Sequence, residues 1–362
     1  MLKIYINREN FANEGEKFMK NRIDLSNFNI RTDLVIDENL QDNYIKKRKV
    51  NDSISVSTTV VNEELSTQLG RKMGRYVTIE FEDVTNYEDR LELIGVVTEE
   101  LKKILKEKKI EDKDSCLVLG LGNRDSTADS LGPITLDKIM VTRHLFLLNT
   151  NVKDGIREVS AISPGVMANT GIETFDIIKS LVSEVKPSFL IVIDALASSS
   201  ISRINKTIQI TDTGIHPGSG IGNNRKEISY EKMGIPVIAI GIPTVVESSI
   251  IVSDTIEYLF QHISYIKTNY DSNKLVFGHR DSRKYLEKLS EQKLNNEERS
   301  QLSGILGTLD EERKRELIGE VLSSINYNMI VTPKEIDFLI DKLSEVIARA
   351  INSSLHREVF EN

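Results

Sequence analysis

Residues 116–133, which read CLVLGLGNRDSTADSLGP, decide the fold. The apolar run at 116–119 predicts a buried strand, a glycine-rich loop follows it, and Pro133 suits the first turn of a helix. A second stretch, FLIVIDALA at 189–197, contains another apolar strand, which ends at Asp194. Strands that alternate with helices are typical of an α/β fold.

The same alternation extends outward from these two stretches. Strands are predicted at 76–81, 116–119, 157–162, 189–194, 207–211 and 236–240. Helices are predicted at 88–106, 133–147, 171–185, 246–263, 282–294, 309–323 and 333–350. We therefore predict an α/β fold with a mainly parallel twisted sheet flanked by helices, and a helical C-terminal region. Residues 1–75 are polar and without clear periodicity, and we expect little regular structure there.

Composition excludes several classes of protein. The chain has 362 residues, of which 39% are hydrophobic and 28% charged, a balance typical of globular proteins. Its net charge is −8 and its basic residues are scattered, so direct binding to nucleic acid is not expected. No signal peptide and no membrane-spanning run is recognisable, which predicts a cytoplasmic protein. The single cysteine, Cys116, lies in an apolar run and is expected to be a buried hydrophobic residue.

Glycine-rich and proline-rich turns follow the predicted strands at 120–123, 163–165, 214–223 and 241–244. Ligands of open α/β sheets bind at the carboxyl ends of strands, so these loops mark the expected site. The candidate substrate-binding residues in the loops are Asn123, His216, Ser219 and Asn223.

Two acidic residues fall at the same strand ends. Asp194 ends its strand, and Asp129 lies in the loop after residue 119. Buried next to each other, two carboxyl groups cannot both ionise freely and share a proton. One can then activate water while the other polarises a carbonyl group. A helix cap or a loop hydrogen bond is the alternative role for each of them.

Other chemistries lack their usual markers. Asp125 stands where a dinucleotide-binding loop would have its third glycine. We find no Walker lysine motif, no zincin helix and no serine-hydrolase elbow. A metal site built from His216, Asp129 and Asp194 is conceivable; hydrogen bonding by a loop histidine is the simpler role.

Longer motifs identify a family. They are LGLGN at 119–123, TADSLGP at 127–133, IDALA at 193–197, QITDTGIHPGSGIGN at 209–223, IPVIAIGIPTVV at 235–246 and VTPKEID at 331–337. In order and content they resemble the spore germination proteases, over roughly residues 24–350.

The resemblance implies an aspartic-type endopeptidase that cuts the small acid-soluble proteins coating spore DNA when a spore germinates. It further implies Asp129 and Asp194 as the catalytic pair, no cofactor and no metal, a location in the spore core, and a homotetramer. The implied fold is similar to that of hydrogenase maturation peptidases.

The family is made as a precursor that removes its own N-terminal segment. DLSNFNIRTDL at 24–34 resembles the processing region, and we predict cleavage between Asp33 and Leu34. The expected organisation is a propeptide at 1–33, a catalytic domain at 34–270 and a helical region at 271–362 that packs on it. Two positions depart from the family pattern: Ala128 replaces a usual proline, and Ser199 replaces a usual arginine for which Arg203 is a candidate substitute.

Two other functions stay open at this point. One is a metal-dependent peptidase of the maturation type, and the other is a binder of spore proteins that keeps the fold without catalysis.

Overall fold

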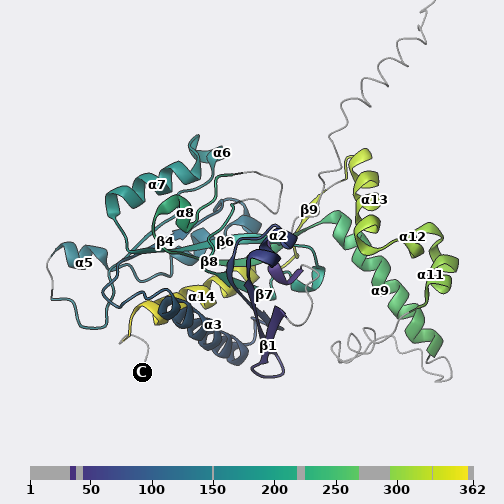
Figure 1. Ribbon diagram of the computed structural model, residues 1–362, viewed down its shortest axis with the longest axis horizontal. Coiled ribbons are helices and arrows are strands. Elements are labelled where there is room, and N and C mark those ends of the chain that lie inside the picture. Colours follow the sequence, from purple (N-terminus) through teal and green to yellow (C-terminus); the bar gives the residue numbers. More distant parts are fainter. Residues whose placement is uncertain are drawn as a thin grey trace, which may run out of the picture. The chain divides into compact units, whose positions relative to one another are not determined.

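Figure 1 shows the computed structural model of the chain, which describes residues 33–37, 44–148, 151–217, 225–268, 294–327 and 329–357. Contacts divide these residues into two compact units. One contains the described residues of 31–259 and 329–362, and the other those of 260–328.

A nine-stranded sheet forms the centre of the first unit. Its strands are β1 (Ile45–Lys49), β2 (Ile54–Val61), β3 (Gly74–Phe81), β4 (Cys116–Gly120), β5 (Val159–Ile162), β6 (Phe189–Ser198), β7 (Thr207–Thr211), β8 (Val237–Glu247) and β9 (Ile330–Val331). The strand order is β1-β2-β3-β7-β8-β6-β4-β5, and β9 pairs with β8. All six strands predicted from the sequence are present.

The predicted mainly parallel sheet is wrong, because the sheet is mixed. Only β8, β6, β4 and β5 pair in parallel, whereas β1, β2, β3, β7 and β9 join it through antiparallel pairs. The connection 199–206 between β6 and β7 is too short for the crossover that a parallel neighbour needs. β7 therefore lies antiparallel to β8.

The expectation of little regular structure up to residue 75 is also wrong. Residues 45–61 form β1 and β2, and α2 (Glu63–Leu69) follows with Asn62 as its N-cap. β1 reads IKKRK and four of its five residues are exposed, so it shows no alternation that would predict a strand. Positive charge on such an edge strand discourages pairing with another chain.

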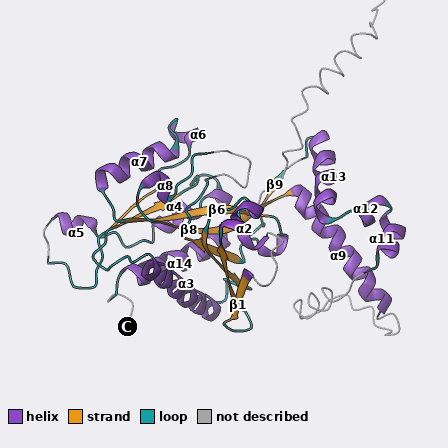
Figure 2. Cartoon of the chain, viewed as in Figure 1, coloured by secondary structure: helices purple, strands orange, loops and turns teal. Residues whose placement is uncertain are grey.

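The helices are drawn in Figure 2. The longer ones are α3 (Tyr87–Glu107), α7 (Thr174–Val185), α9 (Ser248–Thr268), α13 (Glu311–Ser324) and α14 (Ile336–Leu355). The shorter ones are η2 (Val35–Asp37), η4 (Thr127–Asp129), α4 (Leu131–Leu136), α5 (Arg143–Leu147), α6 (Met167–Thr170), η5 (Ile201–Arg203), α8 (Tyr230–Met233), α11 (Asn296–Ser303) and α12 (Ile305–Thr308). The predicted helix at 282–294 falls, except for its last residue, outside the described residues.

The predicted helix at 133–147 is interrupted. Between α4 and α5, the side-chain amide of Asn352 accepts from the N–H of Met140 and donates to the carbonyl of Lys138. Thr142 then accepts from the N–H of Val159 and donates to the carbonyl of Arg157. Asn352 thus satisfies two backbone groups that a continuous helix would have paired internally, and Thr142 ties the interruption to the segment of β5. Both partners are distant in the sequence, so sequence periodicity alone could not reveal the break.

Hydrophobic clusters cover both faces of the sheet. On one face, alternate β6 residues such as Ile191 pack with α3 and α14, which lie side by side in Figure 1. On the other face, Leu190 and Val192 pack with Ile178 of α7. Burial of each such side chain stabilises the fold by about 1.5–3 kcal/mol. Cys116 belongs to the first cluster, as expected for a buried hydrophobic residue. Because strand side chains alternate, Asp194 faces the same side as Leu190 and Val192.

The second unit is helical in its described part. A capping box of Asn295 and Glu298 begins α11, and the Asp310 side chain caps α13. Arg299 lies over the ring of Phe260. Among the described residues of the chain, no helix combines the length and apolar character needed to cross a membrane.

Candidate active site

Asp194 lies on the central strand β6, between β4 and β8. Its side chain is only 6% exposed, and the N–H of Ala195 donates to its Oδ1 at 2.9 Å. Apolar residues precede it along the whole strand, so burial is imposed by the strand itself. The sheet thus holds a carboxyl group where little water can reach it.

Asp129 reaches the same place from the loop after β4. The N–H of Asn123 donates to its Oδ2 at 2.8 Å, and the Thr244 hydroxyl donates to the carbonyl of Ala128 at 2.6 Å. Gly122 makes this approach possible: its φ is 107°, and a Cβ there would lie 2.0 Å from the Asp129 carbonyl oxygen. The loop is therefore fixed from both sides of Asp129.

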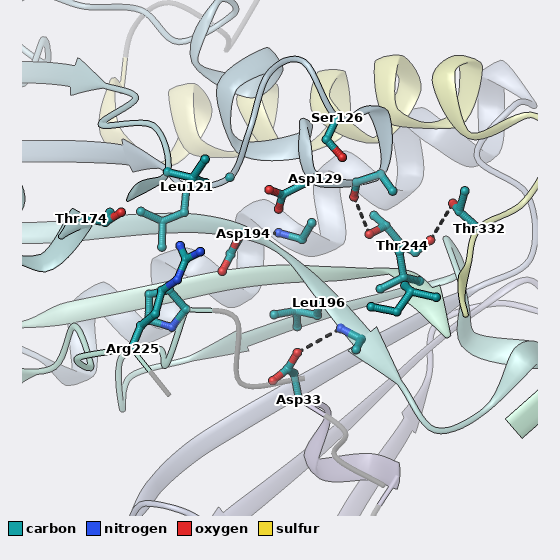
Figure 3. Close-up of a pocket in the computed structure, with 18 of the residues that line it drawn as sticks. Asp33, Leu121, Ser126, Asp129, Thr174, Asp194, Leu196, Arg225, Thr244 and Thr332 are labelled. Carbon is teal, nitrogen blue, oxygen red and sulfur yellow. Dashed lines mark hydrogen bonds between the residues drawn. The ribbon is translucent and has the colours of Figure 1, made fainter. Parts of the chain in front are cut away.

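Figure 3 shows the cavity that these groups share, with a volume of about 350 Å³. Asp129 and Asp194 both line it, together with Asp33 and Arg225. In the close-up the Arg225 guanidinium lies beside Asp194. The cavity thus brings together three carboxyl groups and one cation.

The two strand-end carboxyl groups differ in their protonation. Burial raises the pKa of Asp194 well above the ordinary range, and the carboxylates of Asp129 and then Asp33 raise it further. Burial also raises the pKa of Asp129, but the N–H of Asn123 and the charge of Arg225 offset part of that effect. As the pH falls, Asp194 therefore holds the shared proton first. The pair titrates as one coupled system.

A segment of the N-terminal part of the chain lies against the end of β6. The N–H of Asp33 donates to the Ala197 carbonyl at 3.1 Å, and the N–H of Ala197 donates to the Asp33 carboxylate at 2.9 Å. Leu34 and Val35 are almost fully buried. Residues 33–35 are therefore docked beside the carboxyl pair.

Asp37 anchors the other end of this segment. Its Oδ2 accepts from the Ser198 hydroxyl at 3.0 Å and from the N–H of Ser199 at 2.8 Å, and its Oδ1 forms an ion pair with Arg203 at 3.0 Å. Arg203 and Ser199, the two positions singled out from the sequence, thus both contact the segment. In this structure Arg203 acts on Asp37 rather than on the carboxyl pair.

A family model described as germination protease matches residues 28–362. The chain belongs to the germination protease family. It is 44% identical over 358 residues to the germination protease of Bacillus velezensis, which covers 94% of this chain and 97% of that protein. The germination protease of Priestia megaterium is 45% identical over 368 residues with the same two coverages.

Membership of the germination protease family confirms the resemblance seen in the sequence motifs and supports a protease function in spore germination. The motif residues that carry the resemblance converge on one place. Asp129, Asp194 and Asp33 line the cavity, and the backbone of Asn123 holds Asp129.

The other predicted site residues lie elsewhere. The His216 ring contacts Glu227 at 2.9 Å and lines a second cavity of about 290 Å³, which also contains Lys72 and Asp33. Asp129 and Asp194 do not line that cavity, so the conceivable metal site of His216 with these two residues is not assembled. Within the described residues, no group of three or more His, Cys, Asp or Glu could hold a metal ion. Ser219 and Asn223 lie outside the described residues.

Three residues in and beside this site received no role from the sequence: Arg225 and Thr244 line the cavity, and Gln209 lines the second cavity, which Asp33 also lines. Arg225 follows the glycine-rich loop, and a cation directly after such a loop was the available signal. Thr244 and Gln209 lie within the family motifs, but neither threonine nor glutamine in a strand is by itself a sign of function. Thr244 donates to the carbonyl of Ala128 in the loop after β4, and Gln209 contacts Asp33 and Val35 of the N-terminal segment.

Proposed function

We propose that this chain is an aspartic-type endopeptidase that processes itself from a zymogen and then begins the degradation of small acid-soluble spore proteins. The observation that carries the proposal is the pair of carboxyl groups in one cavity, with the pKa of Asp194 raised well above that of an ordinary aspartic acid. One protonated and one ionised carboxyl group are what hydrolysis by an activated water requires.

In the proposed mechanism Asp129 is the base. Its carboxylate takes a proton from a water molecule, and the hydroxide attacks the carbonyl carbon of the peptide bond. Asp194 donates its proton to the carbonyl oxygen as that oxygen gains charge. When the tetrahedral intermediate collapses, Asp194 regains this proton and Asp129 passes its own to the leaving nitrogen, so both groups return to their starting states.

The bond proposed for self-processing joins Asp33 to Leu34. Asp33 lines the same cavity as the carboxyl pair, and both its backbone and its carboxylate are hydrogen-bonded to Ala197 of β6. A segment docked in this way occupies the place that a protein substrate would need. Residues 1–33 would then be the propeptide, residues 34–270 the catalytic domain and residues 271–362 a helical region that packs on it.

The proposed substrate and setting are those that the resemblance to the germination proteases implies. Small acid-soluble spore proteins coat DNA, and a chain with net charge −8 would contact them without binding the DNA itself. We place the enzyme in the spore core as a homotetramer, with a catalytic domain similar in fold to hydrogenase maturation peptidases and no cofactor.

The test is self-cleavage of the purified full-length chain at mildly acidic pH. We expect a fragment that begins at Leu34 in the wild type, and a rate reduced about 10²–10⁴-fold in Asp129→Asn and Asp194→Asn because each loses a proton-transfer group. Asp125→Asn, the same change at an exposed position of the same loop, is the matched control and should cleave normally. Normal cleavage by either folded dyad variant would exclude the proposed pair.

A further inference from the structure

Gln209 and Asp194 occupy matching positions on strands of the same sheet, with one strand between them. Asp194 of β6 pairs with Gly241 of β8, and Gly241 pairs with Gln209 of β7. Residues that pair directly across strands point to the same face of a sheet, so Gln209 and Asp194 point to the same face. Two strand spacings separate their backbones by about 10 Å, and the Leu196 side chain lies over Gly241 between them.

Gln209 contacts the bond proposed for self-processing. Its Nε2 donates to the carbonyl oxygen of Asp33 at 3.0 Å, and its Oε1 accepts from the N–H of Val35 at 2.8 Å. The second bond fixes the orientation of the amide, because an N–H group can be paired only with the oxygen. The nitrogen must then face the Asp33 carbonyl. This carbonyl belongs to the peptide bond between Asp33 and Leu34.

Burial and neighbouring side chains restrain the Gln209 side chain in this position. Only 6% of its surface is exposed, and it lies within a five-residue strand that is buried throughout. Its neighbour Gly241 leaves space that the Leu196 side chain fills, since a Cβ at Gly241 would lie 2.3 Å from a Leu196 methyl carbon. The amide is therefore held by the sheet and by the segment together, with little freedom to turn away.

We propose that Gln209 is a catalytic residue that binds the carbonyl oxygen of the bond to be cut. Its amide N–H adds to the proton of Asp194 in stabilising the negative charge that develops on this oxygen. A donor placed before the reaction needs no rearrangement when that charge forms. This role rests on the proposed self-processing at Asp33 and Leu34. Once the segment has been cut, the same amide would bind the corresponding carbonyl of a protein substrate.

The experiment measures the rate of self-cleavage of full-length variants over a series of pH values, read by mass spectrometry of the fragment that begins at Leu34. Gln209→Met keeps the size of the side chain but removes the donor, and we expect a rate about 10²–10³-fold lower. Gln68→Met, the same change at an exposed glutamine of α2, should match the wild type. A folded Gln209→Met chain that cleaves at the wild-type rate overturns the inference.

Gln209→Glu separates catalysis from a structural role. The carboxyl group that this variant introduces cannot donate to the carbonyl when it is ionised, whereas its protonated form can. The ratio of the variant's rate to the wild-type rate should therefore rise as the pH falls. A constant ratio across the pH series contradicts the inference, and this result decides the matter even if Gln209→Met fails to fold.

The same experiment separates the two levels of the proposal. Normal cleavage by Asp194→Asn with slow cleavage by Gln209→Met would overturn the carboxyl pair alone. Normal cleavage by Gln209→Met with slow cleavage by Asp194→Asn would overturn the role of Gln209 alone. A wild-type chain that yields no fragment at any pH would overturn the proposed function and the inference with it.

Discussion

Asp129 and Asp194 carry the same chemical group in two different settings. Asp194 is part of a central strand and almost fully buried, and the N–H of Ala195 donates to its carboxyl group. Asp129 sits in a half-buried loop, where the N–H of Asn123 and the charge of Arg225 favour its ionised form. The contrast shows how the position of a carboxyl group alone changes its pKa, which is raised well above the ordinary range for Asp194 and is partly held down for Asp129.

The largest effect should come from moving the loop that holds Asp129. Gly122→Ala would place a methyl group against the Asp129 carbonyl at a φ of 107°, so the carboxylate must shift. A displacement of about 1 Å can reduce a rate about 100-fold, and we expect a loss of this size in self-cleavage. Gly95→Ala is the control, because nothing lies within 4 Å of the added Cβ on α3. Equal rates of self-cleavage for Gly122→Ala and Gly95→Ala would contradict the close contact between Gly122 and Asp129.

Replacing the buried acid Asp194 by its neutral amide should stabilise the protein at neutral pH. Because the pKa of Asp194 is raised in the folded chain, the folded state binds its proton more tightly than the unfolded state does. This contribution to stability is complete below the unfolded pKa and is lost as the pH rises toward the folded pKa. Asp194→Asn should therefore have a higher melting temperature than the wild type at neutral pH.

The advantage of Asp194→Asn should shrink at acidic pH, where Asp194 is protonated in both states. Asp129→Asn should show a smaller gain, because the rise in the pKa of Asp129 is partly offset. Thermal melts of the three chains between acidic and neutral pH check both statements. An advantage that is the same at every pH would instead point to altered packing.

The smallest effect should come from the hydroxyl that holds the Asp129 loop from β8. Thr244→Val removes the hydrogen bond to the carbonyl of Ala128 and keeps the shape of the side chain. We expect a loss of about 1 kcal/mol in the free energy of unfolding. Self-cleavage should also be slower, but the rate should fall less than in Gly122→Ala. Thr255→Val, at an exposed threonine of α9, is the control. Denaturant unfolding would measure the difference, and an unchanged rate would show that the loop does not need Thr244.

The two carboxyl groups could be predicted from the sequence, but several of the strands and residues around them could not. That Asp129 and Asp194 lie in one place could be predicted from the sequence, because acidic residues at the carboxyl ends of apolar strands fall where ligands of α/β sheets bind. The strand β1 could not be predicted because its charged residues show no alternation. The antiparallel direction of β7 could not be predicted because strand direction depends on connections and pairing partners rather than on local pattern. Arg225 and Gln209 were missed because the residues that they contact or affect, Asp33 and Asp194, lie more than thirty positions away in the sequence.

The proposed catalysis requires that Asp194 holds its proton when Asp129 has lost its own. The most direct measurement is an NMR titration of carbon-13-labelled aspartate side chains in the full-length chain, with the Asp194 signal assigned by its absence in Asp194→Asn. We predict that this signal titrates well above the pH of about 3.9 that is typical of aspartic acid, and at a lower pH in Asp129→Asn. An Asp194 signal that titrates near that ordinary value in the wild type would contradict the account.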